Sequence, residues 1–120
     1  MRAIHNLSKE ARFDIILLLL EKRSKKELAA ELGITPAAVA KFVSKLTHPS
    51  DETLERAIQI ADNDERKRIV KIIIHDLING LKEAIENYGD YVDDEEIEEI
   101  KEIIVDYLEG KRELLSLRLV

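Results

Sequence analysis

Several residue types that support particular folds or functions are absent or scarce in this 120-residue chain. It has no cysteine and no tryptophan, one methionine, two prolines and four glycines, and only 4% of its residues are aromatic. Without cysteine, neither disulfides nor thiolate metal sites can form. The longest apolar run, Ile15 to Leu20, is far shorter than the roughly 20 residues that span a bilayer. The N-terminus also lacks a signal-peptide cleavage pattern, so we expect a cytoplasmic protein.

The composition is otherwise that of a globular protein. An apolar content of 45% is enough for the core of one domain, or of one small domain with an oligomerisation appendage. Lys, Glu and Ile are abundant beside the missing Cys and Trp, which is a thermophile-like bias.

The charge is divided unevenly along the chain. The net charge is −6, but residues 1–50 contain nine Lys/Arg and five Asp/Glu, whereas residues 51–120 contain ten and twenty. The first part is therefore basic, with a net charge of +4, and the second is acidic, with −10. Because salt screens charges beyond about 8–10 Å, a phosphate near the basic part is influenced mainly by the local cluster. That cluster consists of Lys22, Arg23, Lys25, Lys26, Lys41 and Lys45.

Residues 24–54 carry three helix starts at fixed spacing. Ser24 and Glu27 form a capping-box pattern, and Gly33 lies where a left-handed residue ends a helix over 25–32. Thr35 followed by Pro36 predicts a second helix start, and Ser50 a third. This order of short helix, tight turn and helix indicates a helix-turn-helix.

The second helix has a buried face and an exposed face. Its apolar residues Val39, Phe42 and Leu46 follow the spacing of a buried stripe. The other face carries the candidate reading residues Ala37, Ala38, Lys41, Ser44 and Lys45.

The stretch SKKELAAELGIT, continued without a gap by HPSDETLERAIQIA, resembles the lambda-repressor/Cro-like (XRE-type) helix-turn-helix family over about residues 12–62. The resemblance implies an all-α bundle that binds double-stranded DNA. Two positions depart from the family pattern. Lys25 replaces a common glutamine, and Lys45 replaces the glycine usual after the recognition helix, which predicts a longer recognition helix over residues 36–46.

The resemblance also implies roles for individual residues. Base-reading residues are expected at Thr35, Ala37, Ala38, Lys41 and Ser44. Phosphate contacts are expected at Arg23, Lys25, Lys26, Lys45 and His48. Since alanine reads only thymine methyl groups and shape, discrimination should rest on Lys41, Thr35 and Ser44, and intrinsic specificity should be modest.

The N-terminal helix predicted over 9–22 is apolar nearly all round, so something must cover its outer side, either the C-terminal helices or a second subunit. The expected stripe is Phe13, Ile16, Leu17 and Leu20, with Ile15, Leu18 and Leu19 off it.

The C-terminal part predicts a helical hairpin. A long helix over 65–87 carries a heptad seam, and a second helix is expected over 94–109, with Gly110 stopping or kinking the chain. Residues 111–120 fit either a helix or a strand, and helix is favoured. The seam consists of Val70, Ile74, Leu77, Leu81, Ala84 and Tyr88.

No pattern indicates an enzyme, a metal or a cofactor. His5, His48 and His75 are too scattered for a zinc site, and no nucleophilic triad, phosphate loop or dinucleotide fingerprint is present. An acidic block lacks the spacing of a calcium loop and fits a solvated helix face at a helix start. It consists of Asp93, Asp94, Glu95, Glu96, Glu98, Glu99 and Glu102.

These observations predict a DNA-binding domain over residues 1–63 and a dimerisation region over 64–120. The leading function is a transcriptional regulator that binds DNA as a homodimer through residues 65–120. Two alternatives remain open: an antitoxin-like or scaffold interaction module with an acidic hairpin, and an architectural DNA binder without sequence choice. The sequence identifies no effector.

Overall fold

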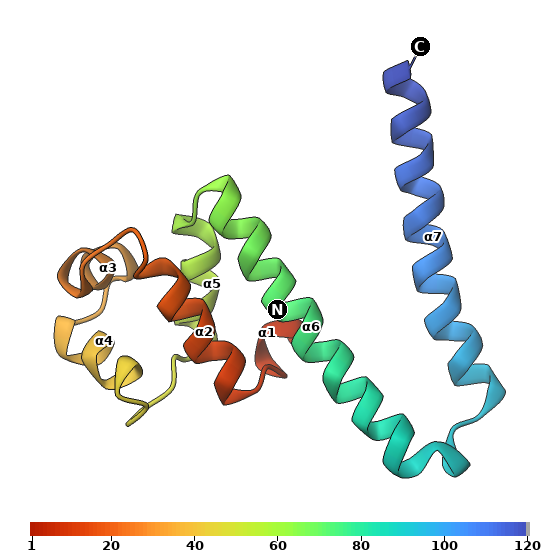
Figure 1. The fold of residues 1–120 in the computed structure, drawn as a ribbon, viewed down its shortest axis with the longest axis horizontal. Coiled ribbons are helices and arrows are strands. Elements are labelled where there is room, and N and C mark those ends of the chain that lie inside the picture. Colours follow the sequence, from red (N-terminus) through yellow and green to blue (C-terminus); the bar gives the residue numbers. More distant parts are fainter. Residues whose placement is uncertain (120) are drawn as a thin grey trace. The chain divides into compact units, whose positions relative to one another are not determined.

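The computed structural model describes the backbone of residues 1–119 and the side chains of residues 1–111. Residues 1–119 contain helices and turns but no strand, which confirms the predicted all-α class. The chain divides into two compact units, Met1–Leu81 and a second that begins at Lys82. The elements in order are α1 (Arg2–His5), α2 (Lys9–Leu19), α3 (Lys25–Leu32), α4 (Pro36–Val43), α5 (Asp51–Ile60), α6 (Asn63–Tyr88), the short 3₁₀ helix η1 (Gly89–Tyr91) and α7 (Asp94–Leu119) (Figure 1).

The predicted helix starts are confirmed by their caps. The Ser24 side chain accepts a hydrogen bond from the Glu27 amide, and the Glu27 side chain accepts one from the Ser24 amide, which completes the capping box. Thr35 caps α4 through the Ala38 amide, and Ser50 caps α5. Local sequence therefore fixes where these three helices begin.

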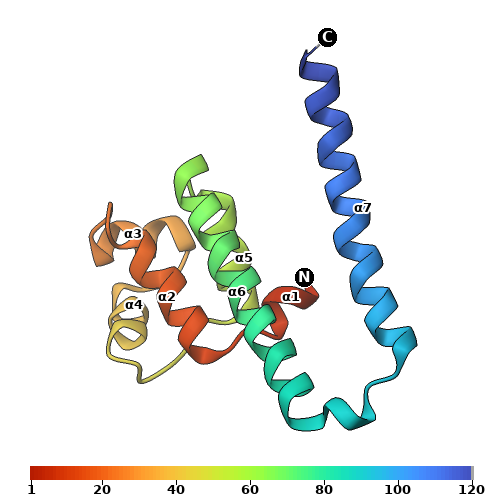
Figure 2. The same cartoon turned by 45° about the vertical axis from the view of Figure 1, so that its right-hand side comes forward.

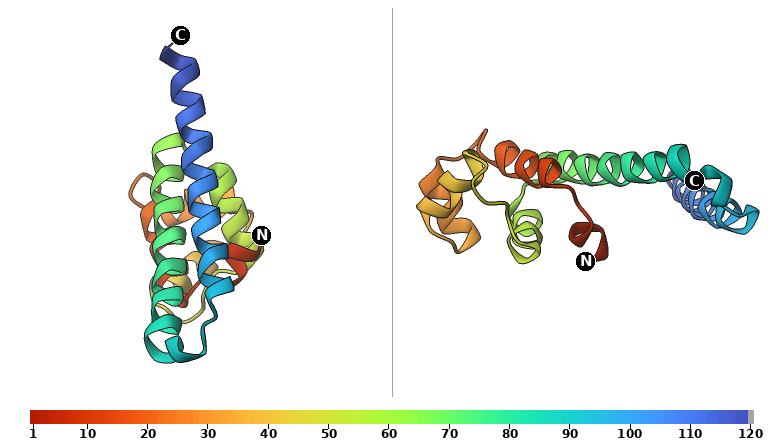
Figure 3. Two further views of the ribbon diagram at one scale, coloured as in Figure 1. Left: turned by 90° about the vertical axis from the view of Figure 1, so that its right-hand side faces the viewer. Right: turned by 90° about the horizontal axis from the view of Figure 1, so that it is seen from below.

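One hydrophobic core holds the first unit together. α3 and α4 lie side by side (Figure 2) and form one end of this unit (Figure 3). The first part of α6 contributes the buried side chains of Ile69 and Ile73. The largest apolar side chains in this core with less than 2% of their surface exposed are Ile4, Ile15, Ile16, Leu19, Leu28, Leu32, Val39, Leu54 and Ile69.

The apolar stripe expected on α2 does not coincide with its buried side. Leu17 is 45% exposed, whereas Ile15, Leu18 and Leu19 are buried beside Ile16. The reason is that α2 has neighbours on more than one side, since residues of α6 join the same core. The sequence left open whether the C-terminal helices or a second subunit cover the outer side of α2. Within the chain, α6 covers part of it.

Two predicted helix ends also differ from the structure. α2 ends at Leu19 rather than at residue 22. α7 continues through Gly110 to Leu119, so the expectation that this glycine stops the helix is wrong. Its backbone lies in the helix with open space around it, and the flanking helix-forming residues carry the chain through.

The first compact unit extends further than the predicted DNA-binding domain. The sequence places the domain boundary after residue 63, whereas the compact unit reaches Leu81. Glu65, Ile69 and Ile73 of α6 are buried in this unit, which accounts for its extent.

The exposed side of α6 carries an apolar row that begins inside the first unit. Leu77, which the sequence places in the seam, packs against the core instead. Ile78, which the sequence places beside the seam, is 51% exposed. The exposed apolar residues of α6 are Val70, Ile74, Ile78, Leu81, Ile85 and Tyr88.

The second unit buries none of its described side chains. As the sequence predicts, the C-terminal part of the chain forms two long helices, α6 and α7, joined by a short segment, while their packing as an antiparallel pair remains a prediction. From Lys82 to Lys111, Val92 and Ile100 are half-buried and all other side chains are exposed, including the acidic block. No helix in the described part of the chain combines the length and apolar character needed to cross a membrane.

Candidate nucleic-acid interface

The turn between α3 and α4 is built around Gly33. This residue has φ 69° and ends α3 in the left-handed conformation, as the sequence predicts. Arg56 of α5 donates a hydrogen bond to the Leu32 carbonyl at 3.0 Å, and its guanidinium lies against the position that a Gly33 side chain would occupy. Glycine is therefore favoured here both by its backbone angle and by the close approach of Arg56.

The second motif helix presents a polar outer side. Val39 is fully buried and Phe42 is buried, so these two side chains anchor α4 to the core. The predicted base-reading residues lie on the other side of the helix or at its ends. Thr35, Ala37, Lys41 and Ser44 are exposed, and Ala38 is half-buried.

Two of these residues use their hydroxyl groups within the motif. The Thr35 hydroxyl oxygen accepts a hydrogen bond from the Ala38 amide at 3.1 Å, and the Ser44 hydroxyl donates one to the Lys41 carbonyl at 3.2 Å. Thr35 keeps its O–H as a donor, and Ser44 keeps its oxygen as an acceptor. Both hydroxyls therefore retain one kind of polar contact for a ligand.

Exposed basic side chains lie at the start of α3 and after the end of α4. Lys25 and Lys26 occupy the first turn of α3, and Lys45 and His48 follow α4; all four are exposed. The Lys45 ammonium lies 5.9 Å from the centre of the Phe13 ring, within range of a cation–π interaction. We call the exposed residues Lys25, Lys26, Thr35, Ala37, Lys41, Ser44 and Lys45 the motif surface.

Arg23 is separated from this group by its own contacts. Its side chain is 12% exposed and donates to Glu65 at 2.6 and 3.1 Å, to Glu31 at 2.5 Å and to the Leu19 carbonyl at 3.1 Å. The hydrogen bond from Arg23 lowers the pKa of the buried Glu65 carboxyl. Arg23 thus ties α2, α3 and α6 together, and each of its three guanidinium nitrogens already donates to a carboxylate or a carbonyl.

The prediction of a longer recognition helix is wrong. α4 ends at Val43, and Leu46, placed on its buried face by the sequence, is 75% exposed. Lys45 has φ 62° and adopts the left-handed conformation itself. The Leu46 amide donates to the Lys41 carbonyl at 2.9 Å and the Lys45 amide to the Phe42 carbonyl at 3.1 Å, the hydrogen bonds of a Schellman end. A lysine here performs the backbone role for which the family uses glycine.

A buried arginine that sequence reasoning missed holds the loop after α4. Arg12 is 6% exposed and donates to the carbonyls of Ile4 at 2.8 Å and Pro49 at 2.9 Å, and to Asp51 at 2.7 Å. The pKa of Asp51 is lowered by the hydrogen bond from His5, at 2.7 Å, and then by Arg12. An arginine within the apolar sequence of α2 could have indicated a buried cation. Its partners could not be predicted, because Pro49 and Asp51 are distant in the sequence.

Comparison with known proteins agrees with this geometry. Residues 16–61 match a family model described as helix-turn-helix. No curated protein and no solved structure matches the chain. Residues 16–61 therefore form a DNA-binding helix-turn-helix domain, and this segment belongs to the lambda-repressor/Cro-like (XRE-type) family.

Proposed function

We propose that this protein is a transcriptional regulator that binds double-stranded DNA as a homodimer and inserts α4 into the major groove. The observation that carries the proposal is the motif surface. It combines the exposed polar and small side chains of α4 with the exposed lysines at the start of α3 and with Lys45, just after α4. That combination suits base edges for the side chains of α4 and phosphates for the lysines.

The chemistry of α4 limits what it can read. Ala37 and Ala38 offer only methyl groups, which contact thymine methyls and sense shape. Lys41 is the one charged side chain on this helix, and guanine O6 and N7 are its best partners in the major groove. We therefore propose that Lys41 supplies most of the discrimination, with Thr35, Ser44 and the half-buried Ala38 beside it.

Phosphate contacts are proposed for Lys25, Lys26, Lys45 and His48, whose side chains are all exposed. Arg23 leaves this set because its guanidinium is held by Glu31 and Glu65. Each lysine that reaches a phosphate releases counterions from the duplex, so affinity should fall steeply as salt rises.

The homodimer is supported by apolar surface that the single chain leaves uncovered. On α7, Ile97, Val105 and Leu108 are 45%, 40% and 44% exposed, and the exposed row of α6 has similar values. Soluble monomers rarely expose long apolar rows of this kind. A second copy offers a self-complementary surface, and its second motif surface would reach a half-site about 34 Å away along the duplex.

Binding titrations test this proposal. Labelled random and genomic duplexes are titrated with the full chain at two salt concentrations. Lys41→Ala should reduce discrimination between duplexes by roughly 1–3 kcal/mol, whereas Lys25→Ala should weaken all duplexes alike and reduce the salt slope by about one unit. Ala38→Glu should abolish binding, because it places a carboxylate at the surface facing the phosphates.

Arg2→Ala is the control, because it removes one exposed positive charge of α1 that belongs neither to the motif surface nor to the apolar rows of α6 and α7. This variant should bind as the unaltered chain does. Equal affinity for all duplexes would favour an architectural binder. Unchanged binding in both Lys41→Ala and Ala38→Glu would remove α4 as the reading helix. Absence of binding to any duplex would favour the interaction module.

A further inference from the structure

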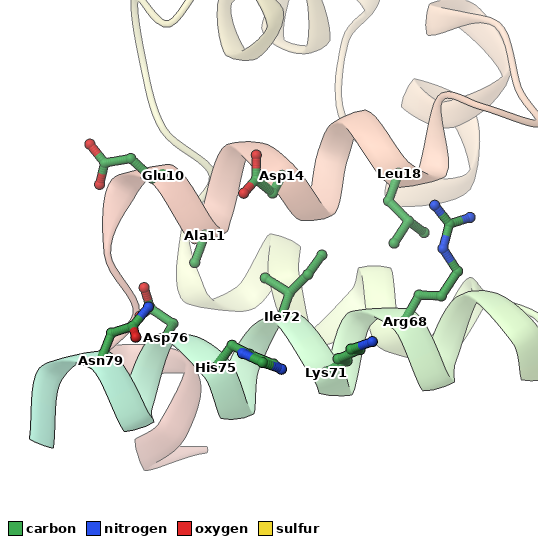
Figure 4. A pocket seen from close by; sticks show the side chains of 10 residues that line it. All are labelled: Glu10, Ala11, Asp14, Leu18, Arg68, Lys71, Ile72, His75, Asp76 and Asn79. Atoms are coloured by element: carbon green, nitrogen blue, oxygen red, sulfur yellow. The ribbon is translucent and has the colours of Figure 1, made fainter. Parts of the chain in front are cut away.

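A groove of about 600 Å³ lies between α2 and α6 within the first compact unit (Figure 4). Its apolar floor is formed by Ala11 and Leu18 of α2 and Ile72 of α6. It lies outside the motif surface, and the DNA-binding function makes no use of it.

The two walls of the groove carry opposite charges. α2 contributes Glu10 and Asp14, and α6 contributes Lys71 and His75. Among the described residues, none of these four side chains takes part in an ion pair within 4.0 Å. The groove therefore has an acidic wall and a basic wall whose charges are available to an incoming surface.

The ends of the groove are fixed by hydrogen bonds. Near one end, Asp76 accepts from the Ser8 amide at 2.9 Å and from the Ser8 hydroxyl at 2.5 Å. Toward the other end, Arg68 donates to Glu21 at 2.6 and 3.0 Å. These contacts hold α2 and α6 at a set separation, so the groove is formed before any partner arrives.

The basic wall is continuous with the exposed apolar row of α6. Lys71 precedes Ile74 by three residues and His75 precedes Ile78 by three, so these pairs are neighbours on the helix surface. Within the first unit, Val70, Ile74, Ile78 and Leu81 are 46%, 49%, 51% and 43% exposed. We call Val70, Ile74, Ile78 and Leu81 the aliphatic ridge. This ridge lies beside Lys71 and His75 of the basic wall, and the acidic wall lies on the other side of the apolar floor.

We propose that this groove receives α6 of a second copy of the chain. The inference rests on the homodimer proposed above and identifies the surface through which the two copies meet. The aliphatic ridge of the partner's α6 lies over the apolar floor. The partner's Lys71, with His75 beside it, faces both Glu10 and Asp14, which are neighbours one turn apart on α2. A two-fold axis repeats each of these contacts, so both acidic walls meet both basic walls.

Charge complementarity distinguishes a second copy from other occupants. An acidic partner would satisfy Lys71 and His75 but would face Glu10 and Asp14 with like charge, and a basic partner would do the reverse. Like charges placed together across an interface disfavour the wrong partner. A second copy carries both signs in the required arrangement, together with the apolar ridge that matches the floor.

A mixing experiment with two charge-reversal variants of the full chain tests this inference. Asp14→Lys and Lys71→Glu should each weaken the homodimer about tenfold or more, because each reversal affects two symmetry-related contacts. An equimolar mixture should form a heterodimer with near-original affinity, since the two reversed charges then face each other and the two unaltered ones do the same. Mixing cannot repair a like-charge contact within one chain, so recovery reports pairing between copies.

Sedimentation velocity over a concentration series supplies the dissociation constants. Gln59→Lys, which adds a positive charge on the exposed side of α5, is the control and should leave dimerisation unchanged. Thermal melts verify that each variant is folded. If Asp14→Lys is not, Glu10→Lys replaces it in the mixture with Lys71→Glu.

The outcomes separate this inference from the proposed function. Variants that dimerise like the unaltered chain, or a mixture no more dimeric than its components, overturn the groove as the interface while the homodimer stands. An unaltered chain that is monomeric overturns both. The DNA titrations of Lys41→Ala and Lys25→Ala do not depend on the groove contacts. They therefore test DNA binding independently, whatever the mixing experiment shows.

Discussion

Residues 1–81 and residues 82–111 are both helical and both carry apolar side chains at helical spacing, yet they differ in what they bury. All buried apolar side chains of the described residues lie between Ile4 and Ile73. On α7, by contrast, Ile103 is 66% exposed and Ile104 is 55% exposed. Helical periodicity therefore indicates an amphipathic helix, but the partner for its apolar face must come from elsewhere, either in the same chain or in another copy.

The largest expected effect comes from matched Ile→Ala substitutions in the two regions. Ile69→Ala removes a fully buried side chain and should lower the free energy of unfolding by roughly 2–5 kcal/mol. Ile104→Ala should change it by no more than about 0.5 kcal/mol at protein concentrations low enough to dissociate a dimer. Urea denaturation of both variants measures the difference, and equal losses would contradict the contrast between the regions.

Glycine substitutions should have opposite signs in the two regions. Gly33→Ala places a side chain at φ 69° against Arg56, and should cost about 1–2 kcal/mol. Gly110→Ala lies within α7 with open space around it, and should stabilise the chain by about 0.5–1 kcal/mol. Thermal melts of both variants check the signs. A Gly33→Ala variant as stable as the unaltered chain would argue against the left-handed turn.

A smaller effect is expected at the end of α4. Lys45 is a non-glycine residue at φ 62°, so Lys45→Gly should relieve strain and raise the free energy of unfolding by up to about 1 kcal/mol. Lys45→Ala is the control, because it removes the same side chain but keeps the strained backbone. A Lys45→Gly variant no more stable than Lys45→Ala would show that the backbone angle carries no cost.

Acid should weaken the junction between α2 and α6. Hydrogen bonds from the Glu65 amide and from Lys22 lower the pKa of Asp62 to about 2, and Arg23 lowers that of Glu65. Since both folded pKa values lie below the unfolded ones, the contribution to stability is present above the unfolded pKa values of about 4 and is lost as the pH falls through the folded ones.

Denaturation between pH 5 and about pH 2 measures this loss. Asp62→Asn should make the free energy of unfolding depend less steeply on pH in this range, because it removes one of the two carboxyl groups whose pKa is lowered. A slope unchanged by Asp62→Asn would place the acid sensitivity elsewhere.

The features that the sequence predicts correctly are those encoded within a few residues. Ser24 with Glu27, Gly33, and Thr35 with Pro36 each act on adjacent backbone groups, so their spacing alone determines the motif. The exposed positions on α4 follow from that motif together with the buried residues Val39 and Phe42.

What the sequence could not predict depends on distant partners. The position of Arg23 in the sequence is that of a phosphate-binding residue. Its side chain instead donates to Glu65, 42 residues further on, so it is not free to contact a phosphate. Lysine has no preference for a left-handed backbone, so nothing local indicates that Lys45 ends α4 as a glycine would. Likewise, Gly110 carries a helix-ending signal that its helix-forming neighbours override.

The measurement that tests the central claim most directly is the mass of the protein–DNA complex. Sedimentation of the full chain with a labelled duplex selected for tight binding should show a dimer at micromolar concentration and two chains on each duplex. Lys41→Ala should leave the dimer intact and lose the preference for that duplex. A monomeric chain, or a complex of one chain per duplex that is unaffected by Lys41→Ala, would contradict the account.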